Sequence, residues 1–250
     1  MSDLPHNAVQ PFAGSEKTKK EQVAEMFDKI AGRYDFMNRF LSARVDVAWR
    51  KKAIRMLRPF QPKTILDVAT GTADMAITTY KMLQPEKIVG IDISENMLAV
   101  GRQKIAKEGL NEQIELLKGD GETINFPNNT FDASMVAFGI RNFENLQAGL
   151  SEMWRVLKPG GQLLVIEFAT PKQPIKALYN FYMGSVAPWV AKRFRQSKEA
   201  YVYLNKSTNA FPDREELLAY FEKAGFEKLK YQSLSLGICC IYTAQKPPEK

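Results

Sequence analysis

The sequence predicts an α/β fold, in which a mostly parallel sheet of seven strands carries helices on both faces and a helical cap. Three observations favour this fold class. From Thr64 onward, short apolar runs alternate with helical patterns of roughly 10–15 residues, which is typical of βαβ units and parallel sheets. The last two apolar runs share a turn near Gly237 and predict an antiparallel hairpin. A chain of 250 residues is also a usual length for one open sheet with its helices.

The segment before the first strand predicts a leader followed by cap helices. Residues 1–20 contain several Pro, Gly, Ser and Lys residues, and we expect a flexible leader with His6 in a polar tail. Residues 21–62 predict N-terminal cap helices, because apolar side chains recur there at helical spacing until Pro59 and Pro62 stop the pattern. Residues 21–250 are expected to form a single domain.

Strands and helices then follow in alternation. The predicted strands cover residues 64–69, 87–92, 114–120, 131–139, 162–168, 226–234 and 237–246. The predicted helices cover residues 73–83, 94–109, 146–157 and 217–225, with Ser94 as an N-cap and a capping box over residues 213–216. Residues 171–210 are rich in Tyr, Phe and Trp, interrupt the alternation and predict a helical insert.

The composition excludes several kinds of site. His6 is the single histidine, so a His-rich metal site is impossible and no metal is expected. A Ser-His-Asp triad would need this tail residue to fold back. Cys239 and Cys240 are neighbours in an apolar strand pattern, so we expect buried thiols on opposite faces and no disulfide. The longest uncharged run, residues 177–191, is too short to span a bilayer.

The charge balance leaves more than one partner open. Lys and Arg number 35 and Asp and Glu 28, giving a net charge of +7. Such an excess is compatible with nucleic acid, an anionic membrane surface or an acidic ligand. The N-terminus lacks the apolar segment of a signal peptide, and we expect a cytoplasmic protein.

Small and acidic residues follow three successive predicted strands. Gly71 lies in a strand-to-helix turn, where backbone N–H groups can approach a ligand closely. Asp92 lies 21 residues further on, about the spacing of a carboxylate that binds ribose hydroxyls. Asp120 ends the third strand and could read an adenine edge. Each feature alone is equally compatible with a tight turn or a helix cap, but three in order favour a nucleoside site at one edge of the sheet.

The type of nucleoside ligand can be narrowed further. No G-x-x-x-x-G-K-[ST] segment occurs, which excludes a P-loop, and one glycine between Ala69 and Ala73 does not match a dinucleotide fingerprint. A cofactor with ribose and adenine but no phosphate suits what remains. S-adenosyl-L-methionine is the common cofactor of that kind.

Specific segments carry a family resemblance. The chain resembles class I S-adenosylmethionine-dependent methyltransferases, which have a Rossmann-like fold, in LDVATGTAD, GIDISENML, GDGETINFPNNTFD and RVLKPGG. It resembles the bacterial quinone-biosynthesis C-methyltransferases of the UbiE/MenG type in MFDKIAGRYDFMNRFLS, WRKKA, AFGIRNF and YLNKSTNAFPDREEL. The resemblance runs from Gln22 to Gln245. It implies methylation of a prenylated quinol, with demethylmenaquinol favoured and the ubiquinone precursor 2-methoxy-6-polyprenyl-1,4-benzoquinol as the alternative.

The resemblance also implies site residues. The cofactor would be contacted by Gly71, Thr72, Asp92, Asp120 and Gly121. The catalytic residues would be Arg141, Asn142 and Tyr34, with the permanent charge of Arg141 stabilising a quinolate. Arg141 is for the same reason a poor base, so the base is expected to be a water held by Arg141 and Asn142, or else Tyr34 or Asp35. Arg44 stands where the family usually has glycine, and the turn there is expected to differ.

The expected partners follow from this substrate. A prenylated quinol is a membrane lipid, and Lys192, Arg193, Arg195 and Lys198 after the aromatic insert could touch anionic headgroups at the inner face of the cytoplasmic membrane. No nucleic acid is expected, since the chain has no appended RNA-binding module. A homodimer stays open, as do another small-molecule methyltransferase and a non-enzymatic cofactor-binding scaffold.

Overall fold

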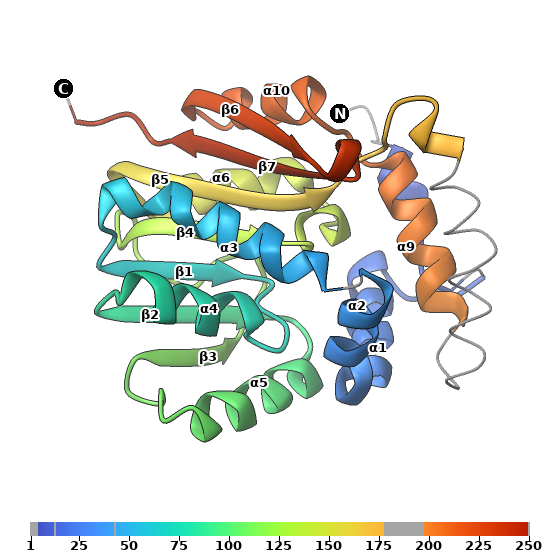
Figure 1. Ribbon diagram of the computed structural model, residues 1–250, viewed down its shortest axis with the longest axis horizontal. Helices are drawn as coiled ribbons and strands as arrows, with labels where there is room; N and C mark the ends of the chain where they lie inside the picture. Colours follow the sequence, from blue (N-terminus) through green and yellow to red (C-terminus); the bar gives the residue numbers. More distant parts are fainter. Residues whose placement is uncertain (1–4, 13, 43, 178–197, 250) are drawn as a thin grey trace.

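The computed structural model describes residues 5–12, 14–42, 44–177 and 198–249, and within them a seven-stranded sheet forms the centre of the molecule (Figure 1). The strands are β1 (Thr64–Val68), β2 (Lys87–Asp92), β3 (Ile114–Lys118), β4 (Phe131–Ala137), β5 (Leu157–Phe168), β6 (Glu227–Leu234) and β7 (Cys239–Gln245). Their order across the sheet is β3-β2-β1-β4-β5-β7-β6. The predicted α/β class is therefore confirmed.

The sheet is parallel from β3 to β5 and antiparallel at β7 and β6. Ile65 of β1 pairs with Ile88 on one side and Ala133 on the other. Strand β7 runs antiparallel to both β5 and β6, which confirms the predicted hairpin; its turn is a 3-10 segment, Ser235–Gly237. All five parallel strands consequently end at the same edge, which is where ligands bind in open sheets of this kind.

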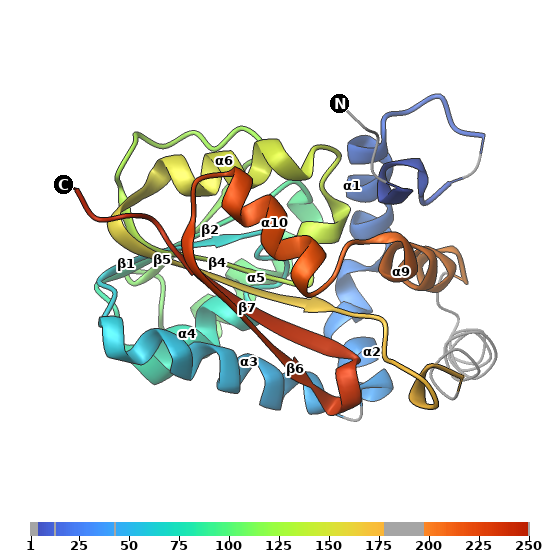
Figure 2. The same cartoon turned by 90° about the horizontal axis from the view of Figure 1, so that it is seen from above.

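Helices cover both faces of the sheet (Figure 2). One face carries α3 (Val45–Leu57), α4 (Asp74–Leu83) and α5 (Glu95–Lys107), whose buried apolar side chains share one core cluster. The other face carries α6 (Leu146–Val156) and α10 (Glu215–Lys223), which share a second cluster. Cys239 belongs to the first cluster and Cys240 to the second, so the two thiols are buried on opposite faces as predicted.

Three further helices lie at the carboxyl edge of the parallel strands, to the right in Figure 1: α1 (Lys19–Ile30), α2 (Tyr34–Leu41) and α9 (Lys198–Ala210). Val23 and Met26 of α1 pack with Tyr203 of α9 in a small cluster of their own. The predicted cap over residues 21–62 is thus partly wrong. Helix α3 covers one face of the sheet, because its buried side, including Ile54 and Leu57, packs against the strands.

Part of the leader packs against the rest of the molecule. Residues Pro5–Ala8 form a 3-10 turn, and His6 within it is fully buried with its ring edge-on to Phe211 at 5.1 Å. The side chain of Lys19 is also buried and donates to the carbonyl oxygens of His6 and Phe143, at 3.0 and 3.1 Å. Placing His6 in a polar tail was therefore wrong, since these contacts seat it beneath α9.

The helix caps and one turn can be compared with the predictions from sequence. Ser94 caps α5 as predicted, because its side chain accepts the N–H of Met97. The capping box over residues 213–216 is absent, since the Asp213 carboxylate accepts the N–H of Thr170 instead. Arg44 has a left-handed backbone, the conformation that glycine favours, with φ of 64°. Most of the insert, residues 178–197, lies outside the described residues.

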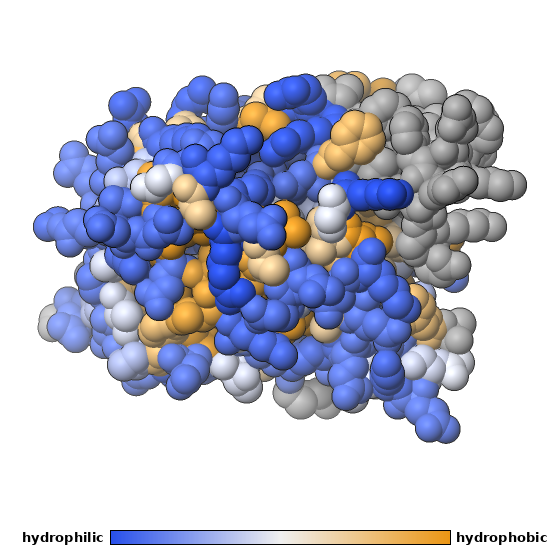
Figure 3. All heavy atoms as spheres, turned by 90° about the horizontal axis from the view of Figure 1, so that it is seen from below, coloured by the Kyte–Doolittle hydropathy of each residue, from blue (hydrophilic) through white to orange (hydrophobic). Residues whose placement is uncertain are grey.

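The surface seen from below is mostly hydrophilic, with small hydrophobic areas between charged side chains (Figure 3). Strand β3 forms one edge of the sheet and exposes Glu115 and Lys118, and charges on an edge discourage pairing with another strand. Within residues 5–12, 14–42, 44–177 and 198–249, no helix has the length and apolar character that crossing a membrane requires.

Burial of His6 predicts a measurable pH dependence. Burial, assisted by the charge of Lys19, lowers the pKa of His6 from 6.5 to about 4. Between these values the unfolded chain binds a proton that the folded protein excludes, so this stability is present above about pH 6.5 and is lost as the pH falls towards 4. We expect His6→Phe, which keeps a ring against Phe211, to be free of this loss.

The measurement is the free energy of unfolding in urea for both proteins at about pH 7.5 and about pH 5. The difference in the free energy of unfolding between the two proteins should shift in favour of His6→Phe at the lower pH. Taking this difference cancels the titration of all other groups. A difference that stays constant would mean that the imidazole is solvated in the folded protein.

Candidate active site

The turn after β1 is held in a tight conformation by buried carboxylates. Ala69, Gly71 and Ala73 all have positive φ, at 52°, 56° and 63°. The Asp67 carboxylate accepts the hydroxyl of Thr70 at 2.6 Å, and burial raises the pKa of Asp67 to about 7. Three left-handed residues in five would be unfavourable without such contacts, so the turn has one defined shape.

Asp92 at the end of β2 fixes this turn to the neighbouring strand. Its carboxylate accepts the N–H of Gly71 at 2.8 Å and the N–H of Ser94 at 2.9 Å. Burial raises the pKa of Asp92, and these backbone N–H groups oppose that shift. The spacing of 21 residues between Gly71 and Asp92 is thus realised as a direct contact that connects the ends of β1 and β2.

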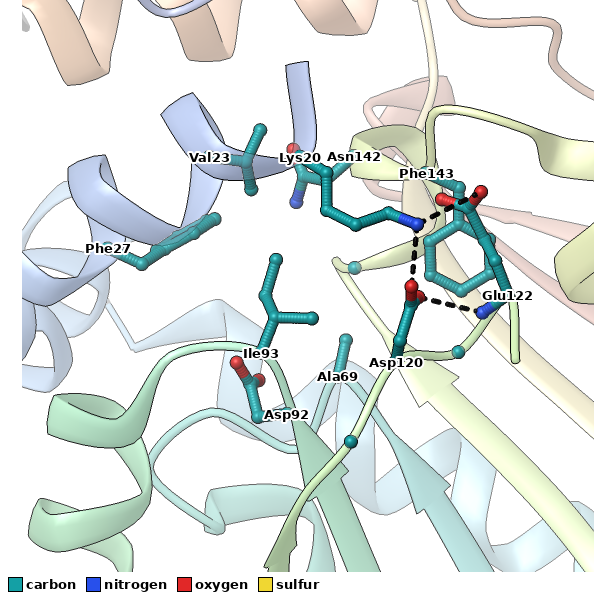
Figure 4. A pocket seen from close by; sticks show the side chains of 13 residues that line it. Lys20, Val23, Phe27, Ala69, Asp92, Ile93, Asp120, Glu122, Asn142 and Phe143 are labelled. Atoms are coloured by element: carbon teal, nitrogen blue, oxygen red, sulfur yellow. Dashed lines mark hydrogen bonds and ion pairs between the residues drawn. The ribbon is translucent and has the colours of Figure 1, made fainter. Parts of the chain in front are cut away.

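A pocket opens at the carboxyl edge beside Asp92 (Figure 4). The sheet contributes Asp92 and Ile93 after β2 and the loop after β3 with Asp120 and Gly121. Position 121 requires glycine, because a Cβ there would lie 2.7 Å from a side-chain atom of Val68 and 2.8 Å from one of Phe143. The pocket therefore combines carboxylates at strand ends with an apolar lining.

Helix α1 forms the opposite wall of this pocket through Lys20, Val23 and Phe27 (Figure 4). The Lys20 ammonium donates to the carboxylate of Asp120 at 2.5 Å and lies 3.5 Å from that of Glu122. This fastens α1 over the loop after β3.

At the other end of the helix, the carboxylate of Asp28 accepts the hydroxyl of Ser94 at 2.5 Å and the N–H of Asn96 at 3.1 Å. Helix α1 is thereby fastened on both sides of the pocket.

Helix α2 is fastened beside the pocket by a charged network. The hydroxyl of Thr72 donates to Asp35 of α2 at 2.5 Å, and Lys104 of α5 donates to Asp35 at 2.7 Å and also to Asp74. Arg39 of α2 lies 3.1 Å from Asp74. Burial alone would raise the pKa of Asp74, but Lys104 and the neighbouring arginines hold it below its usual value. The Thr72 hydroxyl is consequently directed to α2 and does not line the pocket.

A buried ion pair lies at the ends of β4 and β5. Arg141 is 5% exposed, and its Nη1 donates to the Glu167 carboxylate at 2.8 Å and to the carbonyl of Phe138 at 2.6 Å. Its guanidinium lies over the ring of Phe168 at 5.5 Å. Burial alone would lower the pKa of Arg141, but the charge of Glu167 raises it above its usual value. The cation is thus permanently charged in an apolar surrounding.

Two tyrosines adjoin this pair. Tyr203 donates to the amide oxygen of Asn142, a pocket residue, at 3.1 Å. Burial raises the pKa of Tyr203 to about 12. Tyr34 packs edge-on against the pocket residue Phe27 at 5.8 Å, and burial raises its pKa although Arg141 opposes the shift. Both phenols therefore stay protonated at neutral pH, so each can donate a hydrogen bond but does not act as a base.

With this geometry established, comparison with known proteins assigns the family. Residues 15–246 match the model of the family described as the ubiE/COQ5 methyltransferase family. The chain belongs to this family. A protein of Bacteroides fragilis named demethylmenaquinone methyltransferase is 46% identical over 98% of this chain and 100% of its own length. One of Geobacter sulfurreducens, named ubiquinone/menaquinone biosynthesis C-methyltransferase UbiE, is 43% identical over 91% of this chain and 90% of its own.

Solved structures agree with this fold. The cyclase SpnF has a TM-score of 0.68 at 17% identity, covering 92% of this chain and 97% of that one. A second structure is that of a Thermotoga maritima protein described as an S-adenosylmethionine-dependent methyltransferase and possible histamine N-methyltransferase. Its TM-score is 0.64 at 18% identity, and the match covers 89% of this chain and 99% of that one. At such identities the likeness extends to the fold alone. The Rossmann-like fold implied by the resemblance is confirmed.

The residues predicted from this family's motifs fall into two groups in the structure. The pocket brings together Asp92, Asp120, Gly121 and Asn142. The remaining four do not line the described pocket, although each adjoins it: Gly71 through Asp92, Thr72 in the α2 network, Tyr34 behind Phe27, and Arg141 in the buried ion pair.

Sequence reasoning missed four residues of this ubiE/COQ5-type site: Lys20, Lys104, Glu122 and Glu167. Lys20 and Lys104 lie on helices whose charged faces look like ordinary solvated surfaces in the sequence. Glu167 did carry a signal, since it is a single acid in the otherwise apolar strand pattern QLLVIEF. A charge in such a strand is buried and needs a partner.

The α2 network predicts an effect on stability. Lys104→Met leaves Asp35 and Asp74 close together without the ammonium between them, and the three side chains are only 19–25% exposed. We expect a loss of about 1–3 kcal/mol in the free energy of unfolding, measured in urea.

Lys81→Met is the matched control, because Lys81 of α4 pairs with Glu108, the residue that follows α5, but at 51% and 44% exposure. That variant should lose less than about 1 kcal/mol. Equal losses in both variants would show that the network does not hold α2.

Proposed function

We propose that this chain transfers the methyl group of S-adenosylmethionine to a ring carbon of demethylmenaquinol, in the biosynthesis of menaquinone. One observation carries the proposal. A pocket that has two carboxylates at successive strand ends occurs together with a buried cation, in a chain that is 46% identical to a protein named demethylmenaquinone methyltransferase. A second relative with that name, from Porphyromonas gingivalis, is 44% identical. The ubiquinone precursor is the second candidate, because other relatives carry both quinones in their name.

The residues present fit an adenosine-bearing methyl donor. Asp92 and Asp120 offer carboxylate oxygens to hydroxyl and amino groups, while Val23 and Ile93 offer an apolar surface to a flat base. We infer that Asp92 and Asp120 orient this ligand and that Gly71 and Gly121 permit its close approach. When bound, it supplies an electrophilic methyl group on a sulfonium. Thr72 would bind through the shape of its turn, since its hydroxyl is directed to Asp35.

Arg141 suits the activation of the quinol. A phenol-like hydroxyl has a pKa of about 10, so a site that stabilises the quinolate makes the ring carbon more nucleophilic. Among the described residues the buried Nε of Arg141 meets no hydrogen-bond partner. A quinolate oxygen would satisfy it. Methyl transfer would form the bond between the ring carbon and the methyl carbon and break the bond between the methyl carbon and sulfur, with S-adenosylhomocysteine as the leaving group. Of the ring proton and the hydroxyl proton, one is released to solvent and the other is returned to the product quinol.

The choice of base follows from the surroundings. Asp35 is occupied by Thr72 and Lys104, and burial raises the pKa of Tyr34, so neither is suited to accept a proton. A water held between Arg141 and Asn142 is the proposed base. Asn142 is positioned for this by Tyr203, whose hydroxyl occupies its amide oxygen and leaves the amide N–H group to donate.

A prenylated substrate requires access from a membrane, and we propose a peripheral contact of the cytoplasmic protein with anionic lipid. The basic residues assigned to it from the sequence are Lys192, Arg193 and Arg195, which lie outside the described residues, and Lys198 at the start of α9. Helix α9 lies at the same edge of the sheet as the pocket, which supports this assignment (Figure 1). A homodimer would not be required for this contact.

The proposed activity has a direct test. Protein incubated with S-adenosylmethionine and a short-chain demethylmenaquinol under reducing conditions should yield the methylated quinol, detected by mass spectrometry. The matched substrate is the 2-methoxy-6-polyprenyl-1,4-benzoquinol with the same chain length, which should react more slowly. No methylated naphthoquinol would contradict the proposal, and a preference for the benzoquinol would favour the ubiquinone alternative.

The role of Arg141 predicts a divided effect. Arg141→Lys keeps a charge near Glu167 but has no Nε in the same place, so kcat should fall about 100-fold, as when one donor to a developing oxyanion is lost. The affinity for S-adenosylmethionine, measured by calorimetry, should change less than about threefold. A collapse of that affinity with unchanged kcat would assign Arg141 to cofactor binding instead.

A further inference from the structure

Glu167 is the acid that the mechanism above does not use. It is the second-last residue of β5 and is fully buried, and both of its carboxylate oxygens accept hydrogen bonds. One oxygen accepts Nη1 of Arg141 and the N–H of Phe168, both at 2.8 Å. The other accepts the backbone N–H of Arg141 at 3.4 Å. One carboxylate therefore holds both the main chain and the side chain of Arg141.

The remaining contacts of Arg141 show how completely its direction is set. Nη1 is shared between Glu167 and the carbonyl of Phe138, and the guanidinium plane lies against Phe168. Phe138 itself has a left-handed backbone, with φ of 60°, so its carbonyl is aimed by a strained turn. Nε of Arg141 is buried and has no hydrogen-bond partner among the described residues.

We propose that Glu167 is a positioning residue, which fixes the guanidinium of Arg141 so that its Nε faces the quinol oxygen. The proposal rests on the proposed function, because it gives Arg141 the task assigned there. Glu167 itself is not expected to touch the substrate, since its oxygens are used within the protein. A planar, forked cation needs such an acceptor to hold one orientation.

The pair also has an electrostatic consequence. Glu167 balances the charge of Arg141, so neutralising Glu167 increases the positive field at the quinol hydroxyl and lowers the pH at which the quinolate forms. The other titratable groups that face the pair are Tyr34 of α2, Tyr203 of α9, Lys19 of α1 and Cys239 of β7. None of these residues is substituted by a change at position 167, although the charge of Glu167 helps to raise the pKa of Tyr203 and of Cys239, and its loss lowers both.

The experiment compares Glu167→Gln and Glu167→Asp with the wild-type protein. Glu167→Gln keeps the shape and loses the charge, so the limiting kcat should fall about 10- to 100-fold while the KM for S-adenosylmethionine changes little. The acid limb of its kcat profile should move to lower pH by on the order of one unit. Glu167→Asp keeps the charge, so its acid limb should stay in place and its kcat should recover in part.

Asp132→Asn is the matched control. The Asp132 carboxylate also accepts two backbone N–H groups, of Lys63 and Thr64, and the ammonium of Lys158 donates to it at 2.7 Å. Asp132 lies at the amino end of β4, however, which is the end opposite to the pocket. Its loss should lower stability and leave kcat and the pH profile within about twofold of wild type. A Glu167→Gln protein that behaves in the same way would overturn the proposal.

A second measurement does not depend on turnover. In protein labelled with ¹⁵N-arginine, the Nε–H signal that disappears in Arg141→Lys identifies Arg141. This signal should be sharp in wild type and in Asp132→Asn, and exchange-broadened in Glu167→Gln. If wild type forms no methylated quinol but the signals behave so, the proposed function fails and the positioning stands. An unchanged Nε–H signal in Glu167→Gln overturns the positioning itself.

Discussion

A guanidinium removed from water has to be balanced, and at the ends of β4 and β5 Glu167 supplies that balance for Arg141. Loss of one partner of such a buried pair typically costs about 3–5 kcal/mol. Because Arg141 lies in the loop after β4 and Glu167 lies near the end of the neighbouring parallel strand β5, the pair also fixes how that loop leaves the sheet. The strained Phe138, the following Gly139 and the pocket residue Asn142 all take their places from this one loop.

The same physical device recurs along the carboxyl edge. Asp67 and Glu167 are buried and Asp92 is half-buried, all at or near strand ends, and each accepts hydrogen bonds from the turn that follows its own or a neighbouring strand. Asp67 and Glu167 therefore shape the loops, whereas Asp92, which lines the pocket, does so and also has lone pairs left for a ligand. A site built in this way is arranged before any ligand arrives, which reduces the cost of ordering on binding.

Much of this could be predicted from sequence, because strand patterns and strand-end residues are local signals. The alternation after Thr64 predicts the sheet, and Asp92, Asp120 and Gly121 follow from their places after β2 and β3. The contacts between distant segments could not be predicted. Periodicity does not reveal that Lys20 reaches Asp120 across 100 residues or that Lys104 fastens α2, and a tail-like composition hid the burial of His6.

The position of α1 also bears on how the chain is made. This helix is translated before the surfaces that it covers, which come from the loops after β2 and β3 and from Tyr203 of α9. Its apolar face therefore has no complete partner until the segment that contains α9 has been synthesised. One wall of the pocket is thus made before the strands that it covers, and its packing waits for a helix that follows β5.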